Sequence, residues 1–365
     1  MAHEELSPIN ITPGAIRFNT DSMKLEYFRI GMEGTDSSSH AGIGTVAAGE
    51  WVQITTDSPE IQTGGTRGLM MGGFHPSSHY LDEILYVNIN TTGNSQAFGE
   101  LTVSDENHVN IAVSDRTRAI SAGGSKFPGT IVDDIEFVTM ASTGNAVDFG
   151  ADLTLARYGG QGASNGTRGI FAGGWTGSAT DVIDYVTIQS TGVSAQDFGN
   201  LSKINHYQAA SMCSSTRAVF AGGRLHPAYY DDIEYVTTST LGNVADFGNL
   251  SAGNSFGALG ITSNSVRGII FGGYAVPAYN NRIEYITIPT LGNSNDFGDL
   301  LSNVGAATGV SSPTRCVMMG GSEPGVVTTI EYIQIMSTGD AVDFGDMHVQ
   351  TTGWAAGASN GHGGL

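Results

Sequence analysis

A Gly-Gly pair recurs six times along the chain, and this repeat constrains the fold more than any other feature. The pairs are separated by 48 to 51 residues and lie at Gly72-Gly73, Gly123-Gly124, Gly173-Gly174, Gly222-Gly223, Gly272-Gly273 and Gly320-Gly321. Self-similarity at a period of this length is typical of repeat architectures. We therefore expect six copies of one unit, and not the two or three unrelated domains that 365 residues would otherwise suggest.

Each repeat contains four short strand patterns, which we letter a to d. In the third copy, an apolar run that opens with Arg predicts strand b at 168–172, and a run of alternating β-branched and aromatic residues predicts strand c at 183–188. An Asp-Phe-Gly triplet at 197–199 marks strand d, and a run of small residues at 159–165 marks strand a. Four strands with a turn every 8 to 12 residues are typical of a β-propeller blade.

The two ends of the repeat region complement each other. Residues 353–361 match strand a of the inner copies, but no strand b follows them. Residues 66–73 match strand b, but no strand a precedes them. We expect these two segments to pair, because the pairing completes one blade, covers two sheet edges and closes the ring.

The repeat resembles the kelch family, in which a Gly-Gly pair ends one strand and an aromatic residue follows in the next. The resemblance covers residues 63–365 and implies an all-β protein with a six-bladed kelch-like β-propeller, closed by a C-terminal strand. Kelch repeats have a Trp soon after the Tyr, whereas here Tyr235 is followed by Phe247 twelve residues later. The resemblance therefore implies the fold but no functional subgroup.

Residues 1–62 form a separate N-terminal segment. Residues 14–27 predict two strands around a polar turn, and residues 51–54 predict a third. This pattern is similar to a short β-unit in structural proteins of tailed bacteriophages, which implies a role in attachment or assembly. The residues that would attach the segment are Ile16, Phe18, Leu25, Tyr27 and Trp51. In an alternative interpretation, the segment is a partial seventh blade.

The repeat motif itself is similar to those of virion proteins from marine phages, especially cyanophages. This second resemblance implies a tail, fibre or knob protein, made in the host cytoplasm and present in several copies in the virion. Residues 1–62 would bind other virion proteins, and the propeller would project and contact a glycan or protein of the host surface. The alternatives are a glycan-binding or glycan-degrading propeller protein and an intracellular kelch-type scaffold.

The charge and the cysteines exclude several other classes of partner. The chain has 15 basic and 35 acidic residues, whereas nucleic acid binding needs clustered cations, so we expect no nucleic acid partner. No apolar run approaches 18 residues, so we expect no membrane insertion. Cys213 and Cys316 occupy different positions in their repeats, which predicts buried free thiols and neither a disulfide nor a metal site.

The sequence contains no complete catalytic motif, so we predict neither an enzyme nor a cofactor. The Asp-Phe-Gly triplet lacks the other kinase motifs, and we expect its Phe to pack between blades. His75 and His79 could share a metal, but a third ligand is not evident, so we predict no metal site. One Arg recurs in every copy; it would pair with the acidic residue of strand c or, alternatively, bind an anion in the channel. These arginines are Arg67, Arg118, Arg168, Arg217, Arg267 and Arg315, and the acidic residues are Glu136, Asp184, Glu234, Glu284 and Glu331.

The loops between strands b and c differ most among the copies. In an up-and-down blade, these loops emerge on the same face as the d–a loops, and they are rich in the residue types favoured at recognition surfaces. We predict that this b–c loop face holds the binding site, although the same residues could serve only to stiffen long loops. The candidate binding residues are Phe74, His75, His79, Tyr80, Phe127, Trp175, Arg224, His226, Tyr229, Tyr230, Tyr274 and Tyr279.

Overall fold

The computed structural model divides the chain into two compact units, Met1–Gln62 and Thr63–Leu365. It describes residues 15–19, 24–30, 49–53, 65–75, 79–102, 107–126, 128–205, 210–225, 227–251, 260–275, 278–323, 325–348 and 354–365. Within these ranges every regular element is a β-strand, and no helix is long and apolar enough to cross a membrane.

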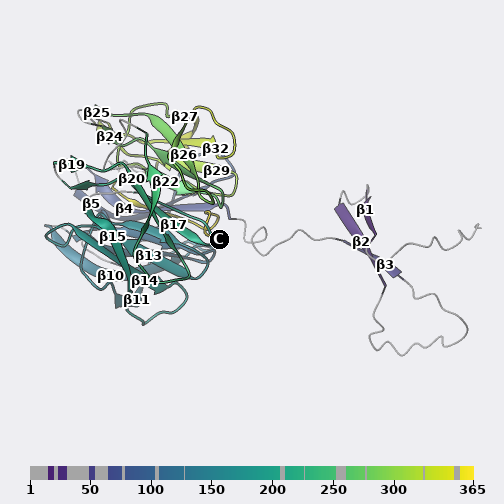
Figure 1. Ribbon diagram of the computed structural model, residues 1–365, viewed down its shortest axis with the longest axis horizontal. Coiled ribbons are helices and arrows are strands. Elements are labelled where there is room, and N and C mark those ends of the chain that lie inside the picture. The colour runs from purple at the N-terminus through teal and green to yellow at the C-terminus, as the bar shows by residue number, and fades with distance from the viewer. Residues whose placement is uncertain are drawn as a thin grey trace, which may run out of the picture. The chain divides into compact units, whose positions relative to one another are not determined.

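The first unit contains one antiparallel sheet of three strands in the order β1-β2-β3 (Figure 1). The strands are β1 (Ile16–Asn19), β2 (Lys24–Ile30) and β3 (Gly49–Gln53). Ile16 pairs with Tyr27 and Phe18 with Leu25, while Trp51 pairs with Phe28. The predicted strands are thus present, although β2 is longer than expected and β3 begins two residues earlier.

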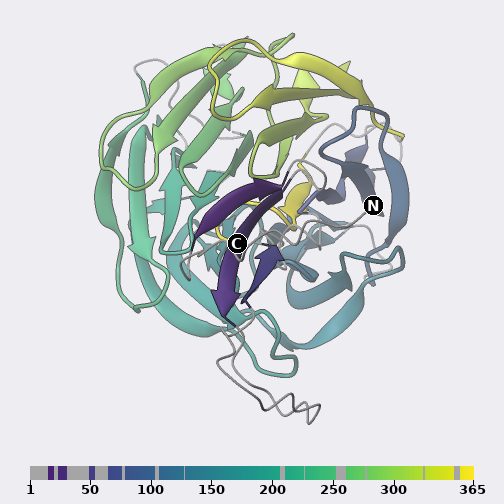
Figure 2. The ribbon, with the colours of Figure 1, turned by 90° about the vertical axis from the view of Figure 1, so that its right-hand side faces the viewer.

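The second unit is a six-bladed β-propeller, as the repeat predicted; Figure 2 shows the blades arranged around a central axis. Blade 1 contains β34 (Ala356–Ser359), β4 (Arg67–His75), β5 (His79–Asn88) and β6 (Gln96–Glu100). Blade 2 contains β8 (Ile111–Ser114), β9 (Arg118–Lys126), β10 (Thr130–Thr139) and β11 (Val147–Asp152), with β7 (Asn107–His108) also paired to β9. Blade 3 contains β12 (Gln161–Ser164), β13 (Arg168–Ala172), β14 (Thr180–Thr187) and β15 (Gln196–Asn205).

The remaining three blades repeat this order from strand a to strand d. Blade 4 contains β16 (Ala210–Cys213), β17 (Arg217–Ala221), β20 (Asp232–Thr237) and β21 (Ala245–Asn249). Blade 5 contains β22 (Gly260–Ser263), β23 (Arg267–Phe271), β26 (Arg282–Thr287) and β27 (Asn295–Asp299). Blade 6 contains β28 (Thr308–Ser311), β29 (Arg315–Met319), β32 (Thr329–Gln334) and β33 (Val342–Asp346). Their b–c loops form the two-stranded ribbons β18 (Arg224–Leu225) with β19 (Ala228–Tyr229), β24 (Tyr274–Ala275) with β25 (Ala278–Tyr279), and β30 (Ser322–Glu323) with β31 (Gly325–Val326).

The C-terminal strand closes the ring, which confirms the predicted seam. Strand β34 pairs antiparallel with β4, and Ser359 lies opposite Gly68. Strand β34 also contacts the innermost strands of both neighbouring blades, β28 and β8. The inner strands of the six blades thus form a closed ring.

The seam has the same turn hydrogen bond as the other blades, although its strands a and b are not consecutive in the chain. In blade 3, the backbone N–H of Arg168 donates to Asn165 Oδ1 at 2.8 Å within the a–b turn. In blade 1, the backbone N–H of Arg67 donates to Asn360 Oδ1 at 2.9 Å, although the two residues are 293 positions apart. Asn360 therefore acts as the turn residue of a hairpin whose two strands come from opposite ends of the chain.

The recurring Arg of strand b links each blade to the next. Its guanidinium lies over the aromatic ring of strand c in its own blade. In blade 5, Cζ of Arg267 lies 4.4 Å from the centroid of the Tyr285 ring. Its Nη1 donates to a backbone carbonyl of the following blade, as from Arg67 to Met140 at 2.7 Å. The same donation occurs in all six blades, including from Arg315 to Ile89 across the seam. The structural role is therefore shown, but the predicted carboxylate partner of these arginines was wrong.

The acidic residue of strand c has a different partner, also in a neighbouring blade. Glu136 of blade 2 accepts hydrogen bonds from the backbone N–H and the hydroxyl of Thr102, which follows strand d of blade 1. Asp184 accepts from Thr154 in the same way. Blade 1 has Leu85 at the corresponding position, opposite Ala97 of strand d. The arginine of strand b and the acidic residue of strand c thus both form hydrogen bonds with polar groups where two blades meet.

The Asp-Phe-Gly triplet has a packing function, as expected for its Phe. In every blade the Phe contacts the aromatic ring of strand c edge to face, at 5.9 to 6.1 Å between centroids. Phe98 also lies in one apolar cluster with Met140 and Ala146 of the next blade. The Gly is required by close approach, because a Cβ at Gly298 would lie 2.4 Å from the carbonyl oxygen of Gly339 in the next blade. The triplet therefore joins blades together.

Deletion of residues 351–365 should lower the melting temperature by many degrees. The truncated chain lacks β34, so β4 loses its hydrogen-bond partner and the ring loses one of its six inner strands. Thermal unfolding of both chains, followed by circular dichroism, measures the change, and removal of Leu365 alone serves as the control. An unchanged melting temperature would contradict closure by β34.

Candidate functional site

The b–c loops form small clusters on one face of the propeller, each built from predicted binding residues. In blade 4, Arg224 pairs with Tyr229 across the ribbon, and its guanidinium lies 5.6 Å from the Tyr229 ring centroid. The Lys203 ammonium lies 5.0 Å from the Tyr230 ring and forms an ion pair with Asp232. Four of the cluster's side chains, those of Arg224, Tyr229, Tyr230 and Asp232, are half-buried. The cluster therefore joins strand d of blade 3 to the b–c loop of blade 4.

Blade 5 presents two tyrosines in a similar ribbon. Tyr274 and Tyr279 are opposite each other in register, and their rings meet edge to face at 5.3 Å between centroids. The Tyr279 ring also covers Gly305, where a Cβ would lie 2.5 Å from the ring. The two rings stiffen this loop and are also half-buried, so one face of the pair remains available to solvent.

The other candidates lie in the b–c loops of blades 1 to 4. In blade 1, Phe74 pairs with Tyr80 and His75 with His79, which extends strands β4 and β5 into the loop. In blade 3, Trp175 forms bridges to Tyr158 and to Ala179. Phe127 and His226 lie outside the described residues, as do the side chains of His79 and Tyr80. The binding role of all these residues stays a prediction.

A narrow polar cavity of about 130 Å³ occupies the centre of the ring. It is lined by the inner strands of the blades, from Asn110 and Gly160 at the end with the d–a loops to Ser114 and Ser164 at the end with the a–b turns. The end lined by Asn110 and Gly160 therefore shares its face with the b–c loops. The C-terminal tail crosses the other end, where Gly363 donates its N–H to the carbonyl of Ser263 at 2.8 Å.

A ring of serines surrounds the closed end of this cavity. Five blades have Ser as the last residue of strand a, namely Ser114, Ser164, Ser263, Ser311 and Ser359. The Ser164 hydroxyl donates to the carbonyl of Ser114 at 2.8 Å and accepts from the Ser114 N–H at 3.1 Å. The other blades repeat this contact, so the hydroxyls connect the inner strands where no strand pairing is possible.

Blade 4 has Cys213 in place of the sixth serine. The Cys213 Sγ lies 3.2 Å from Nδ1 of His362 in the C-terminal tail, and both side chains are buried. Sequence reasoning missed this pair, and the signal it could have used is a Cys at a position where the other copies have Ser. Cys213 and His362 are 149 positions apart in the sequence, and only ring closure brings them together, so no local pattern indicates the contact.

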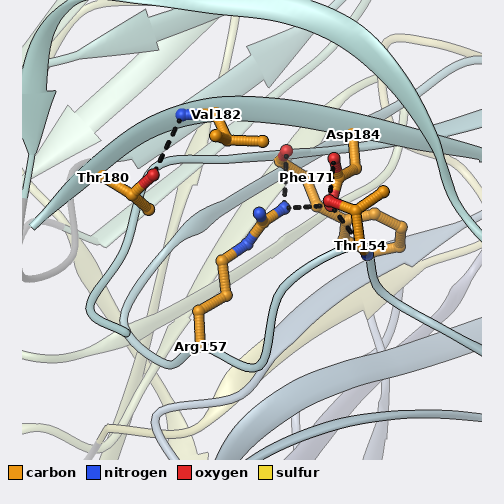
Figure 3. Close-up of polar contacts among 6 residues, drawn as sticks. All are labelled: Thr154, Arg157, Phe171, Thr180, Val182 and Asp184. Atoms are coloured by element: carbon orange, nitrogen blue, oxygen red, sulfur yellow. Dashed lines mark hydrogen bonds and ion pairs between the residues drawn. The ribbon is translucent and has the colours of Figure 1, made fainter. Parts of the chain in front are cut away.

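A second pair that the sequence did not reveal is buried between blades 2 and 3 (Figure 3). Arg157 Nη2 lies 3.0 Å from Asp184 Oδ2, and neither side chain is exposed. The same nitrogen donates to the carbonyl of Phe171 at 3.1 Å, whereas Nε and Nη1 have no partner. Burial lowers the pKa of Arg157 below its ordinary value, although Asp184 opposes this change. Blade 5 has Val304 where blade 2 has Arg157, and the strand of blade 6 beside it has Glu331 in place of Asp184.

No protein-family model matches the chain, and no curated protein matches it either. The described residues contain no group of three or more His, Cys, Asp or Glu side chains that could hold a metal ion. The site must therefore be interpreted from its own geometry. The kelch and phage resemblances of the motifs stay predictions.

Replacement of Arg157 by Val should destabilise the propeller by about 3–5 kcal/mol, because it leaves the Asp184 carboxylate buried without its charged partner. The double variant Arg157→Val with Asp184→Glu reproduces the arrangement found between blades 5 and 6, and we expect it to recover most of the loss. Chemical denaturation of the three chains measures the free energies of unfolding. Equal stability of the single and double variants would contradict this interpretation.

The stability of the Glu331→Gln variant relative to the parent should depend on pH. Burial raises the pKa of Glu331 and the nearby Asp343 raises it further, while the N–H of Leu301 lowers it, with a net increase. A raised pKa in the folded state stabilises the fold below the ordinary pKa, and this contribution is lost as the pH rises through the folded-state value. The variant should therefore gain on the parent as the pH rises above about 4.3, the ordinary pKa of a glutamate. Melting temperatures below and above this pH measure the difference, and a constant difference would contradict the prediction.

Proposed function

We propose that the protein is a non-enzymatic structural component of a tailed-phage particle. In this proposal residues 1–62 dock onto other virion proteins, and the propeller projects from the particle in several copies. The observation that carries it is the division of roles along the chain. The residues repeated in all blades are used to hold the blades together, whereas the variable residues lie on one face, and a separate small sheet precedes them.

The contacts between blades support a role as a rigid projecting body. The Arg and the aromatic residues act at every blade boundary, the Asp-Phe-Gly glycine allows a close backbone approach at five of the six, and the serine ring connects the inner strands. A propeller whose polar repeat residues are used in this way presents a fixed platform, and its loops can vary without loss of the fold. Such a platform suits a particle component that must keep its shape while its loops adapt to a partner.

The b–c loop face supports contact with the host surface. Tyr229, Tyr230, Tyr274 and Tyr279 are held by ribbons and by cation–π or edge-to-face contacts, which reduces the conformational entropy lost when a partner binds. Tyrosine provides a flat apolar surface together with a hydroxyl, and this combination suits a carbohydrate or a protein partner. We propose that host recognition, where it occurs, uses this face.

The proposal predicts that the chain is found in purified particles of the virus that encodes it. Mass spectrometry of those particles should detect it with the known structural proteins, and cryo-electron microscopy should show a six-bladed disc. Purified full-length protein should also bind host cells, and the Tyr229→Ala with Tyr230→Ala variant should bind more weakly. The Leu241→Ser variant, which alters an exposed residue in the c–d turn on the opposite face, is the matched control. Absence of the chain from the particles would refute the proposal, and hydrolysis of a glycan by the pure protein would favour the glycan-degrading alternative.

A further inference from the structure

Cys213 occupies the serine position of blade 4, and its thiol contacts a histidine of the C-terminal tail. It keeps part of the ring's hydrogen bonding, because its N–H and carbonyl bond to the Ser263 hydroxyl as the backbone groups of other blades do. Its Sγ lies 3.2 Å from Nδ1 of the His362 imidazole, whereas the Ser164 hydroxyl lies 3.3 Å from Nε2 of the same ring. A thiol and an imidazole in direct contact are the two parts of an activated nucleophile.

The hydrogen bonds of His362 orient it as a base toward the sulfur. Its Nε2 lies 2.9 Å from the carbonyl of Ser114, and because a carbonyl can only accept, Nε2 carries the hydrogen. The N–H of Gly364 points to Nδ1 at 3.1 Å, which requires a lone pair on that nitrogen. The same lone pair of Nδ1 also faces Cys213 Sγ at 3.2 Å. When Nδ1 takes the thiol proton it gives up the hydrogen bond from Gly364, and the Ser114 carbonyl stabilises the imidazolium that results. A nucleophile, a base and a group that orients the base are present together.

The thiol lies on the wall of the central cavity. Cys213 and His362 both line this polar cavity of about 130 Å³, which has room for several water-sized molecules. Cys316, in contrast, is fully buried in strand b of blade 6 and lies in an apolar cluster, and burial raises its pKa well above the ordinary thiol value. The chain thus contains one thiol beside a base and a cavity, and one thiol beside neither.

We propose that Cys213 is a modification site, a thiol that His362 activates toward small uncharged hydroperoxides entering through the central cavity. Hydrogen peroxide suits this cavity, because it has only two heavy atoms, forms hydrogen bonds with a polar lining and carries no charge to desolvate. In the reaction, the sulfur attacks one peroxide oxygen, a sulfur–oxygen bond forms and the oxygen–oxygen bond breaks. The thiol proton passes through Nδ1 of His362 to the leaving oxygen, so the products are a sulfenic acid and water.

The electrostatics of the pair agree with this geometry. Burial raises the pKa of the Cys213 thiol, but His362, the Ser164 N–H and the Ser263 hydroxyl outweigh it, so the pKa lies below the ordinary value. Burial likewise lowers the pKa of His362, while Cys213, the Ser114 carbonyl and Asp115 raise it to a greater extent. The proton is therefore transferred from sulfur to nitrogen more easily than in an isolated buried thiol.

The test treats the full-length protein with hydrogen peroxide in the presence of dimedone, which traps sulfenic acids, and locates the adduct by mass spectrometry. We expect the adduct at Cys213 to form about 100-fold faster than at Cys316 in the native protein, since general bases contribute factors of this order. Both cysteines should react at the same rate in guanidinium chloride. The Cys213→Ser variant, which restores the serine of the other five blades, should melt like the parent and form no adduct at this position. Equal rates at the two cysteines in the native protein would overturn the proposal.

The role of His362 is tested separately with the His362→Asn variant and with the pH profile of the parent. The variant should react at Cys213 about 10-fold to 100-fold more slowly, while an unchanged rate at Cys316 shows that the fold is intact. In the parent, the rate at Cys213 should reach its plateau below about pH 8, the lower end of the range for an ordinary free thiol. A variant that reacts as fast as the parent, or a parent rate that still rises steeply above that pH, would contradict activation by His362.

Discussion

The propeller depends on the pairing of its last strand with its first. A ring of sheets has no free edges only if the chain ends meet, and here β34 provides the innermost strand of the blade that β4 to β6 begin. The Asn360 side chain provides the turn hydrogen bond that a continuous hairpin would have at this position. One antiparallel pairing therefore converts six open blades into a closed body, and it places the C-terminal tail across the end of the channel.

Cohesion between blades relies on a set of contacts repeated at each boundary. The guanidinium of the strand b arginine lies on an aromatic ring of its own blade and donates to a backbone carbonyl of the next blade. One side chain therefore contacts two neighbouring blades. The Phe of strand d fills the space between two sheets, and the following Gly allows the backbones to approach. Buried polar groups at the boundaries are thereby satisfied, which avoids the cost of leaving them without partners.

Departures from the repeat mark where the molecule does something specific. Asp184, which stands where four other blades have Glu, forms a fully buried ion pair with Arg157. The change from Ser to Cys at position 213 puts a thiol in the serine ring beside the tail histidine. The loops of the b–c face differ from blade to blade, and each makes its own contacts, such as the Arg224–Tyr229 and Tyr274–Tyr279 pairs. The repeated residues thus build the scaffold, and the positions that depart from the repeat form the buried ion pair and the thiol–imidazole pair.

The sequence by itself determined the number of blades, the four strands of each blade and the seam, because these follow from periodicity and from hydrophobic patterns that act over a few residues. It also identified the recurring Arg and the Phe of strand d as structural, since every copy repeats them. Only the tertiary structure decided the partners of these side chains. The arginines donate to carbonyls of the next blade. The carboxylates accept from Thr, Ser or Leu groups at the end of strand d or just after it in the previous blade, across intervals of about 30 residues. The pairing of Cys213 with His362 was equally inaccessible, because the two residues meet only after the ring has closed, and no local pattern encodes a contact made by closure.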